Sequence, residues 1–213
     1  MQHLLDHVGV AVAAITGVLA ARGKRVDLFG VIVLAVVTAF GGGTVRDLCL
    51  GSTPVFWITE PRFLLNAVGV GVLTFFVARF REFPESVLLV ADAFALAFFT
   101  MAGARKSLLL GTGPTIAVAM GVITGVVGGM IRDVLTGEIP LVFRQRIYLY
   151  ATAALAGALV MVLLDHYLPG RQLCQIVGVG TILVLRLGAI RWKLSLPEFE
   201  PMGGPSPDSQ IRR

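Results

Sequence analysis

The stretch Gly42-Gly43-Thr44-Val45-Arg46-Asp47 recurs 86 residues later as Gly128-Gly129-Met130-Ile131-Arg132-Asp133. Each copy ends a long apolar segment and is followed by a Gly and then a Pro. Between residues 42–55 and 128–141, six of fourteen positions are identical. The repeat predicts a chain of two related halves, each with Gly-Gly and Arg-Asp at matched places in an apolar helix.

The composition predicts an integral membrane protein surrounded by membrane lipids. The chain of 213 residues is 56% hydrophobic and 15% charged, with a mean hydropathy of +0.84. Soluble domains carry about 25% charged residues, and the apolar segments here are about as long as a bilayer is thick. The net charge of +5 does not indicate a nucleic-acid partner, because the Lys and Arg residues lie between apolar segments, where they orient a chain in the membrane.

The predicted fold is an all-α membrane protein with seven transmembrane helices, arranged as two inverted three-helix repeats plus a seventh helix. The repeats are residues 1–85 and 86–168, the seventh helix lies within 169–195, and 196–213 is a flexible cytoplasmic tail rich in Pro and Gly. Each repeat has an odd number of spans, so the second enters the membrane in the opposite sense. The predicted spans are roughly Val8–Ala21, Leu28–Leu50, Phe63–Ala78, Ser86–Ala104, Pro114–Val134, Ile147–Leu164 and Cys174–Ile190.

Charge distribution predicts the orientation of these spans. Thirteen of the 18 Lys and Arg residues fall on one side of the membrane. The positive-inside rule then places the C-terminus in the cytoplasm and the N-terminus outside. On this topology Arg46-Asp47 lies near the outer surface and Arg132-Asp133 near the cytoplasm, one pair near each mouth of a common path.

The glycine runs Gly41-Gly42-Gly43 and Gly128-Gly129 have two interpretations. Small residues let membrane helices approach each other closely, but packing needs only one glycine of a run that covers every face of the helix. Consecutive glycines favour a kink or break, and broken backbone at membrane depth is tolerated only where protein or a water-filled cavity satisfies it. We therefore rank a kink that lines a polar pathway ahead of packing.

Ionisable residues within the apolar segments are functional candidates by default. Because adjacent residues on a helix do not face each other, we expect each residue of an Arg-Asp pair to find a partner elsewhere. The alternative role for these pairs is to anchor helix ends at the membrane surface. The candidates for the electrostatics of the pathway are Arg46, Asp47, Asp92, Arg132 and Asp133.

Arg105 and Lys106 close the fourth predicted helix and are either anchors or charges that sense the membrane potential. No catalytic residue, cofactor site or metal site is predicted. The sequence has no nucleophile elbow, no phosphate-binding P-loop and no cluster of metal ligands.

The doubled Gly-Gly-x-x-Arg-Asp motif, with Pro54-Val55-Phe56-Trp57 after its first copy, resembles a family of small prokaryotic membrane proteins whose repeat is labelled a glycine-transporter domain. That family is similar to the trimeric intracellular cation (TRIC) channels, and the resemblance covers about residues 4–190. It implies a homotrimer with a pore inside each protomer that conducts monovalent cations, chiefly potassium. It also implies Gly-rich kinks beside the pore and a gating role for Arg105 and Lys106.

Two features depart from the family pattern: Val127 stands where a third glycine would complete the second run, and the Lys-Glu-Val motif of animal members is absent. The expected function is a potassium-permeable channel in the plasma (inner) membrane of a prokaryote, with ions passing between the first, second, fourth and fifth helices. The alternative is a secondary transporter of a small solute such as glycine, because inverted repeats with broken helices are common in transporters.

Overall fold

The structure, a computed structural model, describes residues 2–144 and 149–192, and its regular elements within these ranges are all helices. Six helices are long and apolar enough to cross a membrane, and Asp6–Ala20 within α1 is a shorter apolar helix. The elements are α1 (Gln2–Ala20), α2 (Leu28–Cys49), α3 (Phe56–Thr59), α4 (Arg62–Phe80), α5 (Glu85–Leu109), α6 (Pro114–Leu135), the 3-10 helix η1 (Leu141–Phe143), α7 (Tyr150–Tyr167) and α8 (Gln172–Trp192).

These elements confirm the all-helical class and six of the predicted spans, while the crossing by α1 stays a prediction. The predicted start at Ile147 and the predicted tail 196–213 lie outside the described residues. Two boundaries are clearly wrong. α1 begins at Gln2 instead of Val8, and α5 continues to Leu109, so Arg105 and Lys106 lie inside the helix instead of closing it. The helix ends only where Gly111 follows, since glycine is the usual residue just beyond a helix end.

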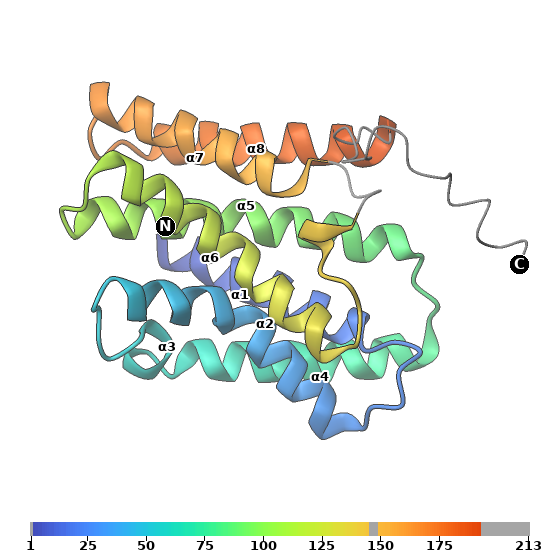
Figure 1. Cartoon of the computed structure of the whole chain (residues 1–213). Coiled ribbons are helices and arrows are strands. Elements are labelled where there is room, and N and C mark those ends of the chain that lie inside the picture. The colour runs from blue at the N-terminus through green and yellow to red at the C-terminus, as the bar shows by residue number, and fades with distance from the viewer. Residues whose placement is uncertain (1, 145–148, 193–213) are drawn as a thin grey trace, which may run out of the picture.

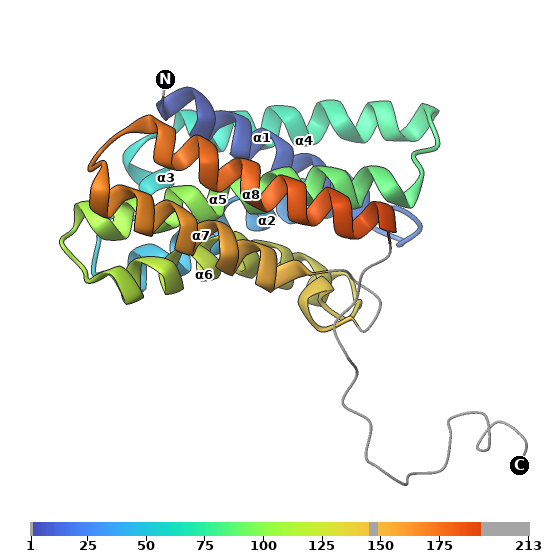
Figure 2. The same cartoon turned by 90° about the horizontal axis from the view of Figure 1, so that it is seen from above.

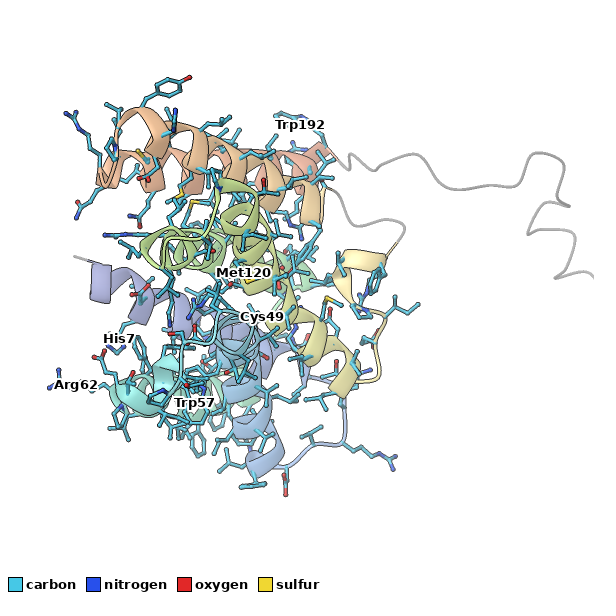
Figure 3. All side chains as sticks on the ribbon, turned by 60° about the vertical axis from the view of Figure 1, so that its left-hand side comes forward. His7, Cys49, Trp57, Arg62, Met120 and Trp192 are labelled. Carbon is cyan, nitrogen blue, oxygen red and sulfur yellow. The ribbon has the colours of Figure 1, made fainter. Side chains whose placement is uncertain are left out.

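The long helices lie side by side in layers (Figure 1), with α7 and α8 against α5 and α6, and with α1, α2 and α4 beyond them. Figure 2 shows α4 and α6 on opposite sides of the bundle. One apolar cluster joins α5, α6, α7 and α8 with Leu141 of η1, and a second joins α1, α2 and α4 with Ala95 of α5. In Figure 3, Trp192 lies on the α7–α8 layer, away from His7, Trp57 and Arg62. We call the end where α1 begins the N-terminal end, and the other the opposite end.

The two copies of the repeat end their helices in the same way. Gly51 after α2 and Gly137 after α6 adopt φ values of 64° and 71°, which cost glycine little. One residue later, the Ser52 N–H donates to the carbonyl of Asp47 (2.8 Å), and the Glu138 N–H donates to that of Asp133 (2.9 Å). A short helix follows each turn, α3 in the first half and η1 in the second. The sequence analysis predicted neither short helix.

Helices α2 and α6 cross with their backbones in contact at Gly42 and Gly128. A Cβ atom on Gly42 would overlap the carbonyl oxygen of Thr124, and one on Gly128 would overlap that of Thr38. Both helices are continuous through their glycines, so neither backbone is interrupted there, and a kink that lines a pathway stays a prediction. At these two positions the glycines permit close helix packing, the interpretation that the sequence analysis ranked second.

Candidate functional site

At the N-terminal end, Asp47 in the last turn of α2 is the centre of a buried ion cluster that we call the Asp47 cluster. Its Oδ1 atom accepts hydrogen bonds from Arg46 Nε (2.7 Å) and Lys106 Nζ (2.8 Å). Its Oδ2 atom accepts from the backbone N–H of Phe56 (2.9 Å), which is free because α3 begins there. One carboxylate thus joins α2, α3 and α5.

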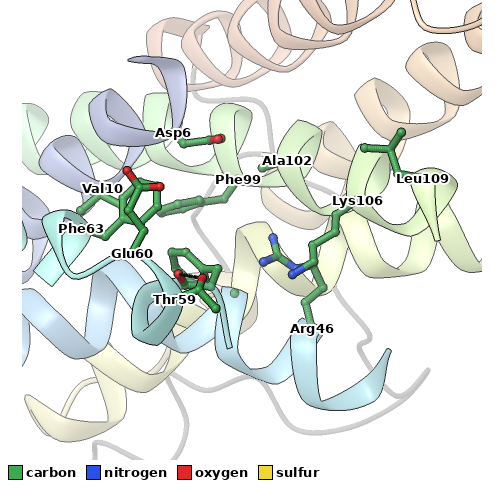
Figure 4. Close-up of a pocket in the computed structure, with 12 residues that line it drawn as sticks. Asp6, Val10, Arg46, Thr59, Glu60, Phe63, Phe99, Ala102, Lys106 and Leu109 are labelled. Carbon is green, nitrogen blue, oxygen red and sulfur yellow. Dashed lines mark hydrogen bonds between the residues drawn. The ribbon is translucent and has the colours of Figure 1, made fainter. Parts of the chain in front are cut away.

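A cavity of about 260 Å³ adjoins the Asp47 cluster and is enclosed by α1, α2, α3, α4 and α5. Arg46 and Lys106 line one side, and Asp6 and Glu60 line another (Figure 4). The cavity is therefore divided between an acidic and a basic side. Apolar side chains, including Phe63 and Phe99, complete its lining, so few polar groups inside it compete with these four charges.

At the opposite end, Arg132 is the centre of a second cluster, the Asp133 cluster, which is buried more completely. Arg132 Nε donates to Asp133 Oδ1 (2.9 Å), and Arg132 Nη1 donates to Asp92 Oδ1 (2.8 Å). Asp133 Oδ2 accepts from the N–H of Leu141, the first residue of η1 (2.8 Å). Each cluster therefore uses an Asp at the end of a long helix to cap the short helix that follows.

Two residues that the sequence analysis did not select complete the Asp133 cluster. The Arg186 guanidinium from α8 lies 4.7 Å from the ring centre of Tyr150 in α7, an arrangement typical of a cation–π contact. Both residues are buried. Arg186 lies within α8, which continues to Trp192, and its side chain is buried in the protein interior. An arginine within an apolar helix is the signal that could have identified it.

The expectation that Arg46 and Asp47 would not pair is wrong, and the same holds for Arg132 and Asp133. Neighbouring Cα atoms project their side chains in different directions, but the long arginine side chain curls back to the adjacent carboxylate. In each pair the aspartate also binds the N–H of the next short helix. This contact with the backbone holds the carboxylate close to the arginine.

The two clusters differ at one matched pair of residues. Asp92 and Arg132 form a buried ion pair, whereas Asp6 and Arg46, the residues 86 positions earlier, line different sides of the cavity (Figure 4). The same residue types are thus joined at the opposite end and face a cavity at the N-terminal end.

The remaining predicted residues are distributed over both clusters. A Cβ atom on Gly43 would lie 2.5 Å from the Phe56 ring, and Gly43 lines the cavity. A Cβ atom on Gly129 would lie 3.6 Å from both Asp92 Oδ1 and Arg132 Nη2. Gly41 instead lies against α6, where its Cβ would meet Ile131. Within the first run, Gly42 therefore packs against Thr124 of α6, whereas Gly43 faces the Phe56 ring and the cavity.

A separate ionic contact at the opposite end lies outside the helices. Lys24 Nζ, in the turn after α1, donates to Glu138 Oε1 (2.6 Å), and Arg144 Nη2 lies 3.3 Å from Glu138 Oε2. The hydrogen bond and charge of Lys24, with the charge of Arg144, lower the pKa of the Glu138 carboxyl below its usual value. Across residues 2–144 and 149–192, no three His, Cys, Asp or Glu side chains are placed to hold a metal ion.

The sequence matches a family model described as Glycine transporter over residues 3–79 and 89–166. It is 47% identical over 197 residues to the UPF0126 inner membrane protein YadS of Escherichia coli, covering 92% of this chain and 94% of the relative. It is 46% identical to a UPF0126 membrane protein of Vibrio cholerae, covering 92% and 82%.

Solved structures with the same fold are TRIC channels. The TRIC trimeric intracellular cation channel orthologue of Rhodobacter sphaeroides matches with a TM-score of 0.86 and 42% identity, over 91% of this chain and 98% of that one. A second TRIC cation channel structure matches with a TM-score of 0.85 and 32% identity, over 95% and 98%.

Proposed function

We propose that the chain is a cation channel of the bacterial inner membrane. The chain belongs to the family of the UPF0126 membrane proteins and of the matching Glycine transporter model. This membership and the TRIC fold support the proposal. The observation that carries the proposal is the charged cavity beside the Asp47 cluster. Ionisable groups that face a cavity between membrane helices mark ion pathways. The name of the family model is a label and supports no substrate by itself.

The proposed channel conducts potassium through each protomer of a homotrimer, with the N-terminus outside. Its path begins at the cavity, passes between α1, α2, α5 and α6, and leaves near the Asp133 cluster. The two halves act as inverted three-helix repeats, one cluster to each mouth. The matched turns after α2 and α6 and the reciprocal contacts of Gly42 and Gly128 support this symmetry.

Lys106 is the member of the Asp47 cluster best placed to move. Its side chain is 28% exposed and lines the cavity, while the Arg46 side chain is 7% exposed. Departure of Lys106 would leave Arg46 as the one cation bonded to Asp47 and would remove a positive charge from the cavity lining, so the cavity would attract a cation more strongly. Lys106 is thus proposed to control the pathway electrostatically. Arg105 has no ion pair with another residue in the described part of the chain and is the second proposed gating charge.

Flux through purified protein in liposomes tests this proposal. Liposomes loaded with potassium chloride and diluted into sodium-free, low-potassium buffer should develop a diffusion potential, read with a voltage-sensitive dye. Lys106→Gln should change the conductance at least several-fold, because it removes the charge that binds Asp47. Arg62→Gln is the matched control, since Arg62 is an exposed cation at the same end of the bundle.

Saturable, ion-coupled glycine uptake without conductance in a planar bilayer would exclude the channel and favour the transporter. Equal conductance for wild type and Lys106→Gln would exclude the gating role but leave the channel intact. Chemical crosslinking in mild detergent tests the trimer, and a dominant dimer would contradict it. Recordings in mixed potassium and sodium measure the selectivity.

A further inference from the structure

A second cavity, of about 330 Å³, lies at the opposite end of the bundle between the end of α1, the start of α2 and the end of α4. It is far from the charged cavity at the N-terminal end and shares no residue with it. Its volume is in the range of small-ligand sites. Its lining is Val18, Ala21, Arg22, Gly23, Lys24, Val26, Val31, Phe75, Ala78 and Arg79.

The charges on this lining are all positive. Arg22, Lys24 and Arg79 are its ionisable residues, and no Asp or Glu is among the lining residues. Arg22 Nη1 donates to the carbonyl of Phe83 (2.8 Å), and Arg22 Nη2 lies 3.6 Å from Glu82 Oε1. Lys24 binds Glu138, so both cations are held in place beside the cavity and each is paired with a glutamate outside the lining. Arg79 is exposed and forms no ion pair within the described residues. Arg79 therefore supplies the uncompensated positive charge of the rim, and this charge attracts an anion.

The rest of the lining is apolar and comes from the membrane helices. Val18 belongs to α1, Val31 to α2, and Phe75 and Ala78 to α4. Helix ends in a membrane protein lie at the level of the lipid headgroups. A site with a cationic rim at this level and an apolar floor toward the bilayer matches a ligand with an anionic head and a hydrocarbon tail.

We propose that this cavity binds an anionic phospholipid of the surrounding leaflet. The phosphate lies against Arg79 and Arg22, and the first part of an acyl chain lies over Val31 and Phe75. Basic pockets between transmembrane helices bind anionic headgroups in this way. The site does not depend on the channel proposal, because it requires only that the chain be embedded in a bilayer.

Native mass spectrometry of the purified full-length protein tests the site. Phosphatidylglycerol and phosphatidylcholine with identical acyl chains are added in equal amounts, and the bound fraction of each is measured. Phosphatidylglycerol should bind at least tenfold more tightly. Arg79→Gln should weaken phosphatidylglycerol binding about fivefold, since one cation near the membrane surface contributes about 1 kcal/mol to anionic lipid binding.

Arg62→Gln is the matched control, because Arg62 is exposed at the other end of the same helix, α4. Ala78→Trp is a second test, because it fills the cavity floor and leaves the charge unchanged. It should also weaken phosphatidylglycerol binding. Circular dichroism verifies that each variant keeps its helix content.

Three results would overturn the proposal. Equal binding of the two lipids would show that the cationic rim selects no headgroup. An equal loss with Arg62→Gln and Arg79→Gln would show general attraction to a positive protein. Full displacement of the lipid by inorganic phosphate at the same concentration would show that the site binds a free anion and that the apolar floor holds no acyl chain.

Discussion

Replacement of Asp92 by Asn removes the charge from the buried pair with Arg132 and keeps nearly the same side-chain volume. In the folded protein Arg132 Nη1 lies 2.8 Å from Asp92 Oδ1, and the two side chains are 0% and 4% exposed. Asp133, which lies 2.9 Å from Arg132 Nε, is not altered by the substitution. The change therefore removes one of two carboxylates that neutralise a single buried guanidinium.

The expected loss of unfolding free energy is about 3 kcal/mol. Two unit charges 4 Å apart attract by about 4 kcal/mol at an effective dielectric constant of 20, and breaking a buried ion pair costs roughly 3–5 kcal/mol. The lower end applies because Asp133 still faces Arg132 and because Asn keeps one hydrogen bond. Asp6→Asn is the matched control, since Asp6 occupies the equivalent position 86 residues earlier and lines the cavity. Its cost should be below about 1 kcal/mol, because Asp6 is only half-buried and solvent weakens the interactions of such a charge.

Both variants are measured by titrating the detergent-solubilised protein with sodium dodecyl sulfate while helix content is followed by circular dichroism. The midpoint and slope give the difference in unfolding free energy from wild type. A loss under about 1 kcal/mol for Asp92→Asn, or an equal loss for Asp6→Asn, would refute the reasoning, since either result means that burial does not distinguish the two positions.

Two further predictions concern the helix crossing and the loop contact. Gly42→Ala should destabilise the protein by about 1–3 kcal/mol, because the new methyl group overlaps the Thr124 carbonyl. Gly69→Ala in α4 is the control, since Gly69 has open space around it, and it should be neutral or stabilising by up to about 1 kcal/mol. Equal shifts of the melting temperature in the two variants would contradict close packing at Gly42. The pKa of Glu138 is lowered in the folded state, so its contact with Lys24 adds stability above the unfolded pKa, near 4.5, and that stability is lost as the pH falls through the folded pKa. Melting curves from pH 6 to pH 3 should therefore show a smaller decline for Lys24→Met than for wild type, and identical declines would argue against the contact.

The two short helices could not be predicted, and the repeat did not indicate Tyr150 or Arg186, the two residues that complete the Asp133 cluster. α3 has four residues and η1 has three, too short for a hydrophobic period to be visible in the sequence. Tyr150 and Arg186 come from α7 and α8, and α8 has no counterpart in the repeat. Its arginine has no matched residue that could have indicated a role.

The pairing of Arg46 with Asp47 was mispredicted because helix geometry describes where side chains start, not where a long side chain ends. An arginine can reach a neighbouring carboxylate when a third group holds that carboxylate in place. The Phe56 N–H supplies this contact to Asp47. The turn after α2 places Phe56, the first residue of α3, within hydrogen-bonding distance of Asp47.

The sequence by itself determined the membrane class, the helices and the two matched positions, because apolar length and repetition are properties of the chain read in order. The tertiary structure decided which glycine of each run packs and which faces a charged cluster. It also decided that Lys106 binds Asp47 across 59 residues of sequence and that Asp92 binds Arg132 across 40. Such contacts depend on how the helices pack against one another, and an identical motif therefore borders a cavity at one end of the bundle and forms a buried ion pair at the other.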